Sequence, residues 1–306
     1  MKKPYKPIGL LGSITRDVIS FSSGKVNKGL GGVLYPASVL CGLQKNVCLM
    51  TNMAEDLASD VFRMVQCWPT MQLSEIKRVS GPGNRVHLFY PEQGERQEVL
   101  KSAVPPLKPE RIINRLPGLD FLVLLMISGL DITLKNWNKI KKKAKCPLWM
   151  DVHSLALSPE LGQIRKYTSI ENWPEWVSGV DYVQANQKEA ASMMGHPERN
   201  PDEEELSFFG QSVLKQGVKA VFITLGEKGI LVISPEGNRM MRSDENSDVV
   251  DTTGCGDVFC GAAASVLAEG RKVTDAVRFG LKLASRAAGR AGIQDTYQMA
   301  QEFLKS

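Results

Sequence analysis

One stretch decides how this chain folds: Asp251-Thr252-Thr253-Gly254-Cys255-Gly256-Asp257, followed directly by Val258-Phe259-Cys260-Gly261-Ala262-Ala263-Ala264. The small, apolar second run predicts a buried helix with Asp257 in its first turn. Two glycines before a helix let backbone N–H groups converge on one point, where the helix dipole also favours negative charge. Such an anion-binding turn beside a carboxylate suits phosphoryl transfer, because the amides hold phosphate charge while the carboxylate takes a proton from an attacking hydroxyl. A glycine-rich turn with Asp257 as a helix cap would produce the same letters.

The stretch resembles the D-T-x-G-A-G-D signature of the PfkB family of carbohydrate and nucleoside kinases, which have the ribokinase-like fold. In that family the last Asp is the catalytic base and the Gly-Ala-Gly backbone forms an anion hole. The resemblance therefore implies catalytic roles for Asp257 and for the backbone of Gly254, Cys255 and Gly256. Cys255 replaces the usual alanine. Because the anion hole uses backbone N–H groups, a side chain of similar small size leaves it intact.

The composition is that of an ordinary globular protein with a sizeable core, at 306 residues, 43% apolar and 23% charged. The net charge of +5 is spread along the chain, apart from five lysines between positions 139 and 145 that we expect on a solvated helix face. No aromatic residues interleave with this basic run, so we expect no nucleic-acid partner. The six cysteines show no zinc or redox spacing, and no apolar run is long enough to span a membrane. We therefore expect a cytoplasmic protein without a membrane partner.

Short strands and helices alternate along most of the chain. This alternation predicts a mostly parallel sheet covered on both faces. The expected strands are 8–11, 47–51, 121–126, 148–150, 181–184, 218–224, 230–233 and 239–241. The expected helices are 35–43, 57–65, 134–144, one beginning near Asn186, and two that close the chain at 258–268 and 274–288.

Residues 75–101 break this alternation. Polar and apolar side chains alternate at 75–79 and 85–90, as in strands with one exposed face, and Pro91-Glu92-Gln93-Gly94 has the composition of a turn. We expect a small projecting β-sheet that the strand near Val18 joins. The ribokinase-like resemblance implies that this sheet, about residues 14–30 and 75–101, is a lid over the sugar site and the contact of a homodimer. The predicted fold is thus one α/β domain over 1–306, a ribokinase-like three-layer α/β/α arrangement with a mostly parallel central sheet and a protruding lid.

The acceptor site is predicted at the carboxyl ends of the strands, where ligands bind in open α/β sheets. Asp17 follows the first strand and matches the acid that holds sugar hydroxyls in ribokinase-like kinases; a turn-capping Asp is the alternative interpretation. Gly31 and Gly32 resemble the family's paired glycines, which let the backbone approach the substrate. The family usually has an Asn shortly afterwards, where this chain has Tyr35 and Pro36.

Asn186-Gln187-Lys188-Glu189 matches the N-x-x-E element of the family. Asn186 and Glu189 lie three apart, on one helix face, so both reach towards the same hydrated Mg²⁺ and phosphates. The resemblance implies that Asn186 binds the nucleotide and that Glu189 serves the metal. A capping box at a helix start would give the same residues.

Thr224-Leu225-Gly226-Glu227-Lys228-Gly229 matches the family's T-x-G-x-x-G nucleotide loop. The resemblance implies nucleotide contacts for Thr224, Gly226 and Gly229, and also for Thr253. A hairpin turn is the alternative interpretation. Leu281 occupies a place where relatives often have Asn or His near the adenine, which predicts an apolar contact to the base.

The remaining polar candidates give no further pattern. His87, His153 and His196 are dispersed without ligand partners at useful spacing, so we expect structural or surface roles for all three. Asp151 ends a predicted strand and is open to a site role or a turn-capping role.

The sequence and the resemblance together predict an ATP-dependent phosphotransferase with Mg²⁺ that acts on a hydroxyl of a sugar or polyol; a monovalent cation is a further cofactor that the family admits. A nucleoside kinase of the adenosine type is the alternative within the same class. A sugar or nucleotide sensor without catalysis is the alternative from another class, since Tyr35, Pro36 and Leu281 depart from the family pattern.

Overall fold

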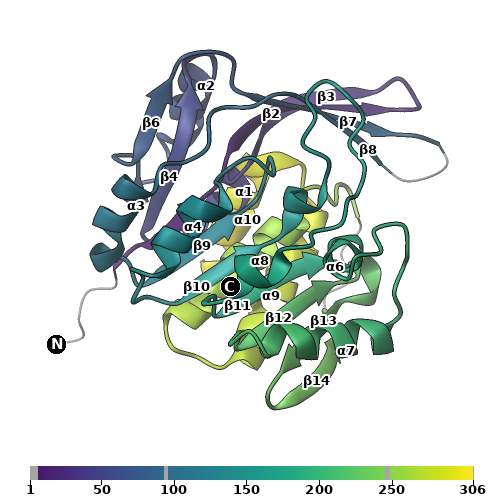
Figure 1. Ribbon diagram of the computed structural model, residues 1–306. Coiled ribbons are helices and arrows are strands. Elements are labelled where there is room, and N and C mark those ends of the chain that lie inside the picture. The colour runs from purple at the N-terminus through teal and green to yellow at the C-terminus, as the bar shows by residue number, and fades with distance from the viewer. Residues whose placement is uncertain (1–5, 93–95, 245–248, 306) are drawn as a thin grey trace.

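The computed structural model describes residues 6–92, 96–244 and 249–305, and its centre is a ten-stranded sheet (Figure 1). The strands are β1 (Ile8–Leu11), β4 (Val47–Ala54), β5 (Met71–Gln72), β6 (Ile76–Val79), β9 (Phe121–Leu125), β10 (Leu148–Asp151), β11 (Tyr182–Asn186), β12 (Ala220–Thr224), β13 (Ile230–Ser234) and β14 (Gly237–Met241). Their order is β14-β13-β12-β11-β10-β9-β1-β4-β5, and β6 also pairs with β4.

The sheet is parallel from β12 across to β4, β5 and β6, and only the β12-β13-β14 edge is antiparallel. All residues of β1, β4, β9 and β10 are buried. Strands that read as continuous apolar runs belong in a parallel sheet because helices cover both of its faces. The predicted mostly parallel sheet is confirmed.

Helices cover the sheet on both faces, which gives the predicted three layers (Figure 1). Within β9, Phe121, Val123 and Leu125 pack into one core, whereas Leu122 and Leu124 pack into the other. The first core includes residues of α1 (Leu34–Gly42), α2 (Glu55–Val65), α8 (Cys255–Ala268), α9 (Val273–Ala288) and α10 (Gly292–Lys305). The second includes residues of α3 (Pro109–Arg115), α4 (Leu134–Lys141), α5 (Trp173–Val177), α6 (Gln187–Met193) and α7 (Glu203–Leu214). The described residues also form three 3₁₀ turns, at Leu116–Gly118, His153–Ala156 and Gly226–Lys228.

An aromatic cluster fixes α8 against the sheet. The ring of Phe222 on β12 stacks on Trp149 of β10 at 4.8 Å between centroids, and Phe259 of α8 meets Phe222 edge-on at 5.9 Å. All three side chains are at most 1% exposed. Because Phe259 lies two residues after Asp257, this packing sets the position of the first turn of α8 over the carboxyl ends of the strands.

A separate four-stranded sheet projects beside the main sheet (Figure 1). Its strands are β2 (Ile14–Phe21), β3 (Val26–Gly32), β7 (Asn84–Tyr90) and β8 (Gln97–Ser102), in the order β3-β2-β7-β8. Val86, Leu88 and Leu100 form a small apolar cluster of its own. The segment after β10 pairs with its edge, since Arg165 N donates to Glu98 O and Gly162 N to Leu100 O, both at 2.8 Å. The predicted small sheet is confirmed, and we refer to these four strands as the lid.

The lid differs from the prediction at one end. Residues 76–79 form β6, which pairs in parallel with β4 of the main sheet, so assigning 75–79 to the lid is wrong. An alternation of polar and apolar residues shows that a strand has one exposed face but not which neighbour it pairs with. Residues 93–95 of the predicted lid and of its turn lie outside the described residues.

Two expectations about helices also need correction. The chain does not close with two helices, because α10 follows α9 and packs on α1 through residues such as Ile293, Tyr297 and Ala300. Lys141 is not on a solvated face: its Nζ donates to the carbonyls of Glu175, Trp176 and Ser178 at 2.6–3.0 Å. The ammonium therefore caps the end of α5. None of the helices within the described ranges is both long and apolar enough to cross a membrane.

The aromatic cluster yields a stability prediction. We expect Phe222→Ala to lower the free energy of unfolding by about 3–5 kcal/mol, because the cavity left beside Trp149 and Phe259 cannot refill. Phe208→Ala is the matched control, since Phe208 is 79% exposed on α7, and we expect a change within about 0.5 kcal/mol. Urea denaturation followed by circular dichroism measures both. Equal losses in the two variants would contradict the proposed role of the cluster.

Candidate active site

The first turn of α8 forms the mouth of a cleft. Gly254 precedes the helix with φ 79°, and a Cβ there would meet the ring of Tyr35 at 2.5 Å, so only glycine fits this turn. Asp251 Oδ1 accepts a hydrogen bond from Thr253 N at 2.8 Å, which fixes the approach to the helix. The backbone of Gly254, Cys255 and Gly256 thus enters α8 at its positive dipole end. Asp257 follows in the same turn.

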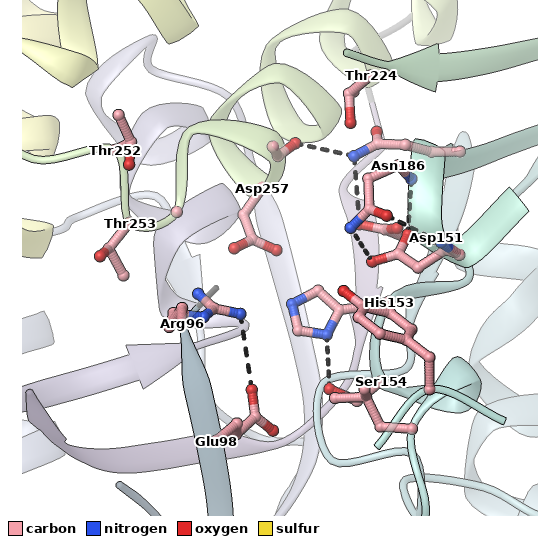
Figure 2. Close-up of a pocket in the computed structure, with 16 residues that line it drawn as sticks. Arg96, Glu98, Asp151, His153, Ser154, Asn186, Thr224, Thr252, Thr253 and Asp257 are labelled. Carbon is pink, nitrogen blue, oxygen red and sulfur yellow. Dashed lines mark hydrogen bonds and ion pairs between the residues drawn. The ribbon is translucent and has the colours of Figure 1, made fainter. Parts of the chain in front are cut away.

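Two cavities, of about 230 and about 80 Å³, meet at this mouth. The larger cavity (Figure 2) is lined by residues from β10, β11 and β12, among them Asp151, Asn186 and Thr224. The smaller cavity is lined by lid residues and by Asp17 and Tyr35. The residues that line both are Arg96, Glu98, His153, Thr253, Gly254 and Asp257. Asp257 therefore stands at the junction, and Asp17 shares the smaller cavity with it.

Residues of β2, β3 and α1 form one side of the smaller cavity. Asp17 lies on β2, opposite β3, and a Cβ at Gly31 would collide with its Oδ2. Glycine at 31 is therefore needed to make room for the Asp17 carboxylate, while Gly32 itself lines the cavity. Asp17 Oδ1 is buried without a hydrogen-bond partner among the described residues, which is unusual for a buried carboxylate. Tyr35 lines the same cavity, where the family pattern has an Asn nearby.

Buried carboxylates crowd around the junction, and their pKa values are raised. Burial, and then the charges of Glu189 and Asp17, raises the pKa of Asp257 to about 7. Burial raises the pKa of Glu189 to about 7 and that of Asp17 to about 6. The pKa of Asp151 is raised as well, by burial and then by the charges of Glu189 and Asp257. Asp257 is thus a carboxylate that can take up a proton near neutral pH.

The lid supplies positive charge to the cleft. Arg96 precedes β8 and is the one cation among the described residues that line either cavity. Glu98 lies between two arginines, with Oε1 at 3.0 Å from Arg165 Nη1 and Oε2 at 3.7 Å from Arg96 Nη2. The Arg165 side chain is 1% exposed and also donates to Ser158 O. This buried ion pair holds the lid edge, and with it Arg96, against the segment that follows β10.

Asn186 and Glu189 form a capping box at the start of α6. Glu189 N donates to Asn186 Oδ1 at 2.9 Å, and Asn186 N donates to Glu189 Oε2 at 2.7 Å. The capping interpretation of these letters is therefore correct, and it leaves room for the predicted ligand role because both residues also line the larger cavity. In residues 6–92, 96–244 and 249–305, no three His, Cys, Asp or Glu side chains are grouped to hold a metal ion. A metal role for Glu189 stays a prediction.

The predicted nucleotide contacts divide into two groups. Thr224, at the end of β12, and Thr253 line the larger cavity together with Asn186. Gly226 and Gly229 lie in the turn between β12 and β13, and neither lines this cavity. Their nucleotide role stays a prediction, although a tight turn with φ 58° and φ 99° already explains two glycines. Leu281 is 8% exposed and belongs to the core beneath α9, so it does not face the cavity.

Sequence reasoning missed three residues of the cleft: Arg96, Glu98 and His153. The expected structural or surface role for His153 did not anticipate its position, because the residue is half-buried and lines both cavities; His87 and His196 are exposed. Its position two residues after Asp151, at the carboxyl end of a parallel strand, is the signal that could have indicated it. Arg96 and Glu98 carried no comparable signal, since only the folded lid brings them to the cleft.

Comparisons with known proteins agree with this arrangement. Residues 130–299, more than half of the chain, match the model of the pfkB family carbohydrate kinases. A ribokinase of Schizosaccharomyces pombe is 31% identical over 119 residues, which is 39% of this chain and 37% of that protein, so the aligned part spans well under half of the relative.

Solved structures extend the similarity to nearly the whole fold. Arabidopsis thaliana ribokinase complexed with ribose and ATP superposes with a TM-score of 0.78 at 19% identity, covering 99% of this chain and 100% of that one. A pyrophosphate-dependent kinase of the ribokinase family, complexed with a pyrophosphate analogue and myo-inositol, gives a TM-score of 0.78 at 16% identity and covers 95% and 98% of the two chains. With the family model matched across the helix mouth that carries Asp257, this chain belongs to the pfkB family of carbohydrate kinases.

Proposed function

We propose that this protein is an ATP-dependent kinase that transfers a phosphoryl group to a hydroxyl of a sugar or polyol. The observation that carries this proposal is the position of Asp257, which lines both cavities at the mouth of α8. An acceptor in the smaller cavity and a phosphate donor in the larger one would meet at this carboxylate. That is the geometry that direct transfer between two bound substrates needs.

Asp257 acts as general base in this proposal. Its Oδ1 is buried without a hydrogen-bond partner among the described residues, so it is free to accept one from an acceptor hydroxyl. A pKa of about 7 lets the group be deprotonated in part of the molecules at neutral pH and hold a proton afterwards. Asp17, across the smaller cavity, orients the acceptor by accepting hydrogen bonds from its other hydroxyls.

The transferring phosphoryl group needs positive charge, and two sources face it. The amides at the mouth of α8, those of Gly254, Cys255 and Gly256, supply hydrogen-bond donors and the helix dipole. Arg96, which borders both cavities, supplies a full charge from the lid. Because Arg96 comes from the lid, a displaced lid would take this full charge away from the phosphoryl group.

ATP and Mg²⁺ fit the larger cavity through its polar lining. Thr224, Thr253 and Asn186 present hydroxyl and amide groups suited to phosphate oxygens. Both oxygens of Glu189 lie within 2.7 Å of Asn186 nitrogens, so Glu189 would hold a hydrated Mg²⁺ through water rather than directly. Bound there, the ion would neutralise phosphate charge.

The lining of the smaller cavity favours a compact polyol as acceptor. Val86, Leu88 and Ile127 offer an apolar surface for C–H groups, and Asp17 and Asp257 offer carboxylates for hydroxyls. The similar structures that hold ribose and myo-inositol contain acceptors of this chemical kind. A nucleoside remains the alternative within the class. The homodimer through the lid and the monovalent cation stay predictions.

A substrate screen tests the function directly. We expect product with ATP and at least one of D-ribose, D-fructose and myo-inositol, detected as the phosphorylated acceptor by mass spectrometry. Adenosine and cytidine belong in the same screen, with GTP and pyrophosphate as alternative donors. Turnover of a nucleoside alone would favour the nucleoside kinase. Acceptor binding by calorimetry without turnover of any acceptor would instead support the non-catalytic sensor.

Removal of the base gives a second prediction. We expect Asp257→Asn to lower kcat by at least about 100-fold, since a general base contributes about 10²–10⁴-fold. The dissociation constant for ATP, measured by calorimetry, should stay within about twofold because the phosphate-binding amides remain. Asp60→Asn is the control: Asp60 pairs with Arg16 at 2.7 Å, outside both cavities, and its loss should leave kcat unchanged. A kcat for Asp257→Asn within tenfold of the wild type would exclude this mechanism.

The raised pKa of Asp257 predicts the pH dependence. A base must be deprotonated, so kcat/KM for the acceptor should fall by about tenfold for each pH unit below a midpoint near the pKa of about 7. Burial is the main cause of the raised pKa, and the Glu189 charge is the next. In Glu189→Gln the midpoint should therefore move to lower pH, whatever happens to the absolute rate. A profile that is flat from about pH 5.5 to about pH 8.5 would contradict the assignment of the base.

A further inference from the structure

His153 has a backbone conformation that residues with side chains rarely adopt, with φ 40°. Among the described residues other than glycine, Gln44 shares a positive φ, and it lies in an exposed turn after α1. His153 instead follows the end of β10 inside the cleft and lines both cavities. Such conformations persist where the surroundings hold them in place, and they concentrate at functional sites.

The strained backbone has a clear structural consequence. The backbone N–H of His153 lies close enough to the carboxylates of Asp151 and Glu189 to lower their pKa values, so the amide faces these two buried acids. The ring is then held by Ser154, whose Oγ lies 2.9 Å from Nδ1. In Figure 2 the ring lies beside Asp257 and Arg96, with the nitrogen that does not contact Ser154 turned toward them. Backbone and side chain together place the imidazole beside the base.

The imidazole is neutral in this position. Burial, followed by the charges of Arg96 and Arg165, lowers the pKa of His153 to about 4. A neutral imidazole has one N–H donor and one acceptor nitrogen. Since Nδ1 is engaged with Ser154, Nε2 is the nitrogen turned to the cleft. A neutral nitrogen is a weak partner for phosphate but a good one for a hydroxyl, which both donates and accepts.

We propose that His153 is a specificity-determining residue, whose Nε2 hydrogen-bonds to a second hydroxyl of the acceptor beside the one that Asp257 deprotonates. The proposal limits the acceptor to compounds with at least two neighbouring hydroxyls, of which His153 binds one and Asp17 binds others. The inference rests on the proposed kinase function and adds to it the residue that selects the substrate. Because the site is built to pair with this hydroxyl, a substrate that lacks it should be rejected.

The test removes the ring and keeps the backbone. His153→Gly suits this purpose because glycine adopts the positive φ freely. The probes are D-ribose with 2-deoxy-D-ribose, D-fructose with its monodeoxy analogues, and myo-inositol with its monodeoxy analogues, each with ATP. Gln44→Gly is the matched control, with the same kind of backbone far from the cleft. His153→Asn is the second variant, because asparagine tolerates this conformation and keeps a polar group.

For His153→Gly we expect KM for the best acceptor to rise about 10- to 100-fold, as for a lost hydrogen bond in a buried site. KM for ATP should change by less than about twofold, and His153→Asn should recover part of the loss. One monodeoxy analogue should have the same high KM with the wild type and with His153→Gly. The hydroxyl that this analogue lacks is then the one that His153 binds. Gln44→Gly should match the wild type in both constants.

Two results would overturn this inference and leave the proposed kinase function standing. The first is an acceptor KM in His153→Gly equal to that of the wild type. The second is an equal rise in KM for every monodeoxy analogue and for ATP. The latter would show a general structural role, and thermal unfolding of each variant by circular dichroism measures that role separately. If the wild type turns over none of the probes or nucleosides, the proposed function fails and this inference fails with it.

Discussion

The central physical constraint is the burial of several carboxylates around the first turn of α8. Asp257, Asp151 and Glu189 come from three separate elements, and burial raises the pKa of each; the Glu189 charge raises the pKa values of Asp257 and Asp151 further. Packing like charges together opposes folding, and the aromatic contacts of Phe259 with Phe222 and Trp149 hold the helix in place despite it. The same crowding that weakens the fold locally prepares a carboxylate for proton uptake near neutral pH, as a general base requires.

The lid supplies positive charge beside these carboxylates. Arg96 brings a cation to the point where the two cavities meet, and the buried pair of Arg165 with Glu98 fastens the lid edge to the segment that follows β10. Arg165 is nine-tenths or more covered, so breaking this pair would leave a buried charge without its partner. Lid position and cleft electrostatics are therefore linked, because moving the lid would move the Arg96 charge away from Asp257.

Space in the cleft is set by residues that are small or strained. Glycine at 31 makes room for the Asp17 carboxylate, and glycine at 254 makes room for the Tyr35 ring while turning the chain into α8. His153 accepts an unfavourable φ because its amide then faces two buried acids. In each case the backbone is arranged around a polar group of the cleft, as expected where function overrides local preference.

The sequence by itself determined the features that are local. A turn and a helix start lie within Asp251–Asp257, so the entry into α8 was predictable from seven residues. The apolar runs of β1, β9 and β10 predicted a parallel sheet because such strands must be buried on both faces. The tertiary structure alone decided what depends on neighbours. Alternation at 76–79 predicted a strand but not its partner, which is β4. Arg96 and His153 reach Asp257 only when the lid and β10 are placed against α8. The raised pKa of Asp257 arises from burial by elements distant in the chain, and no stretch of sequence carries that information.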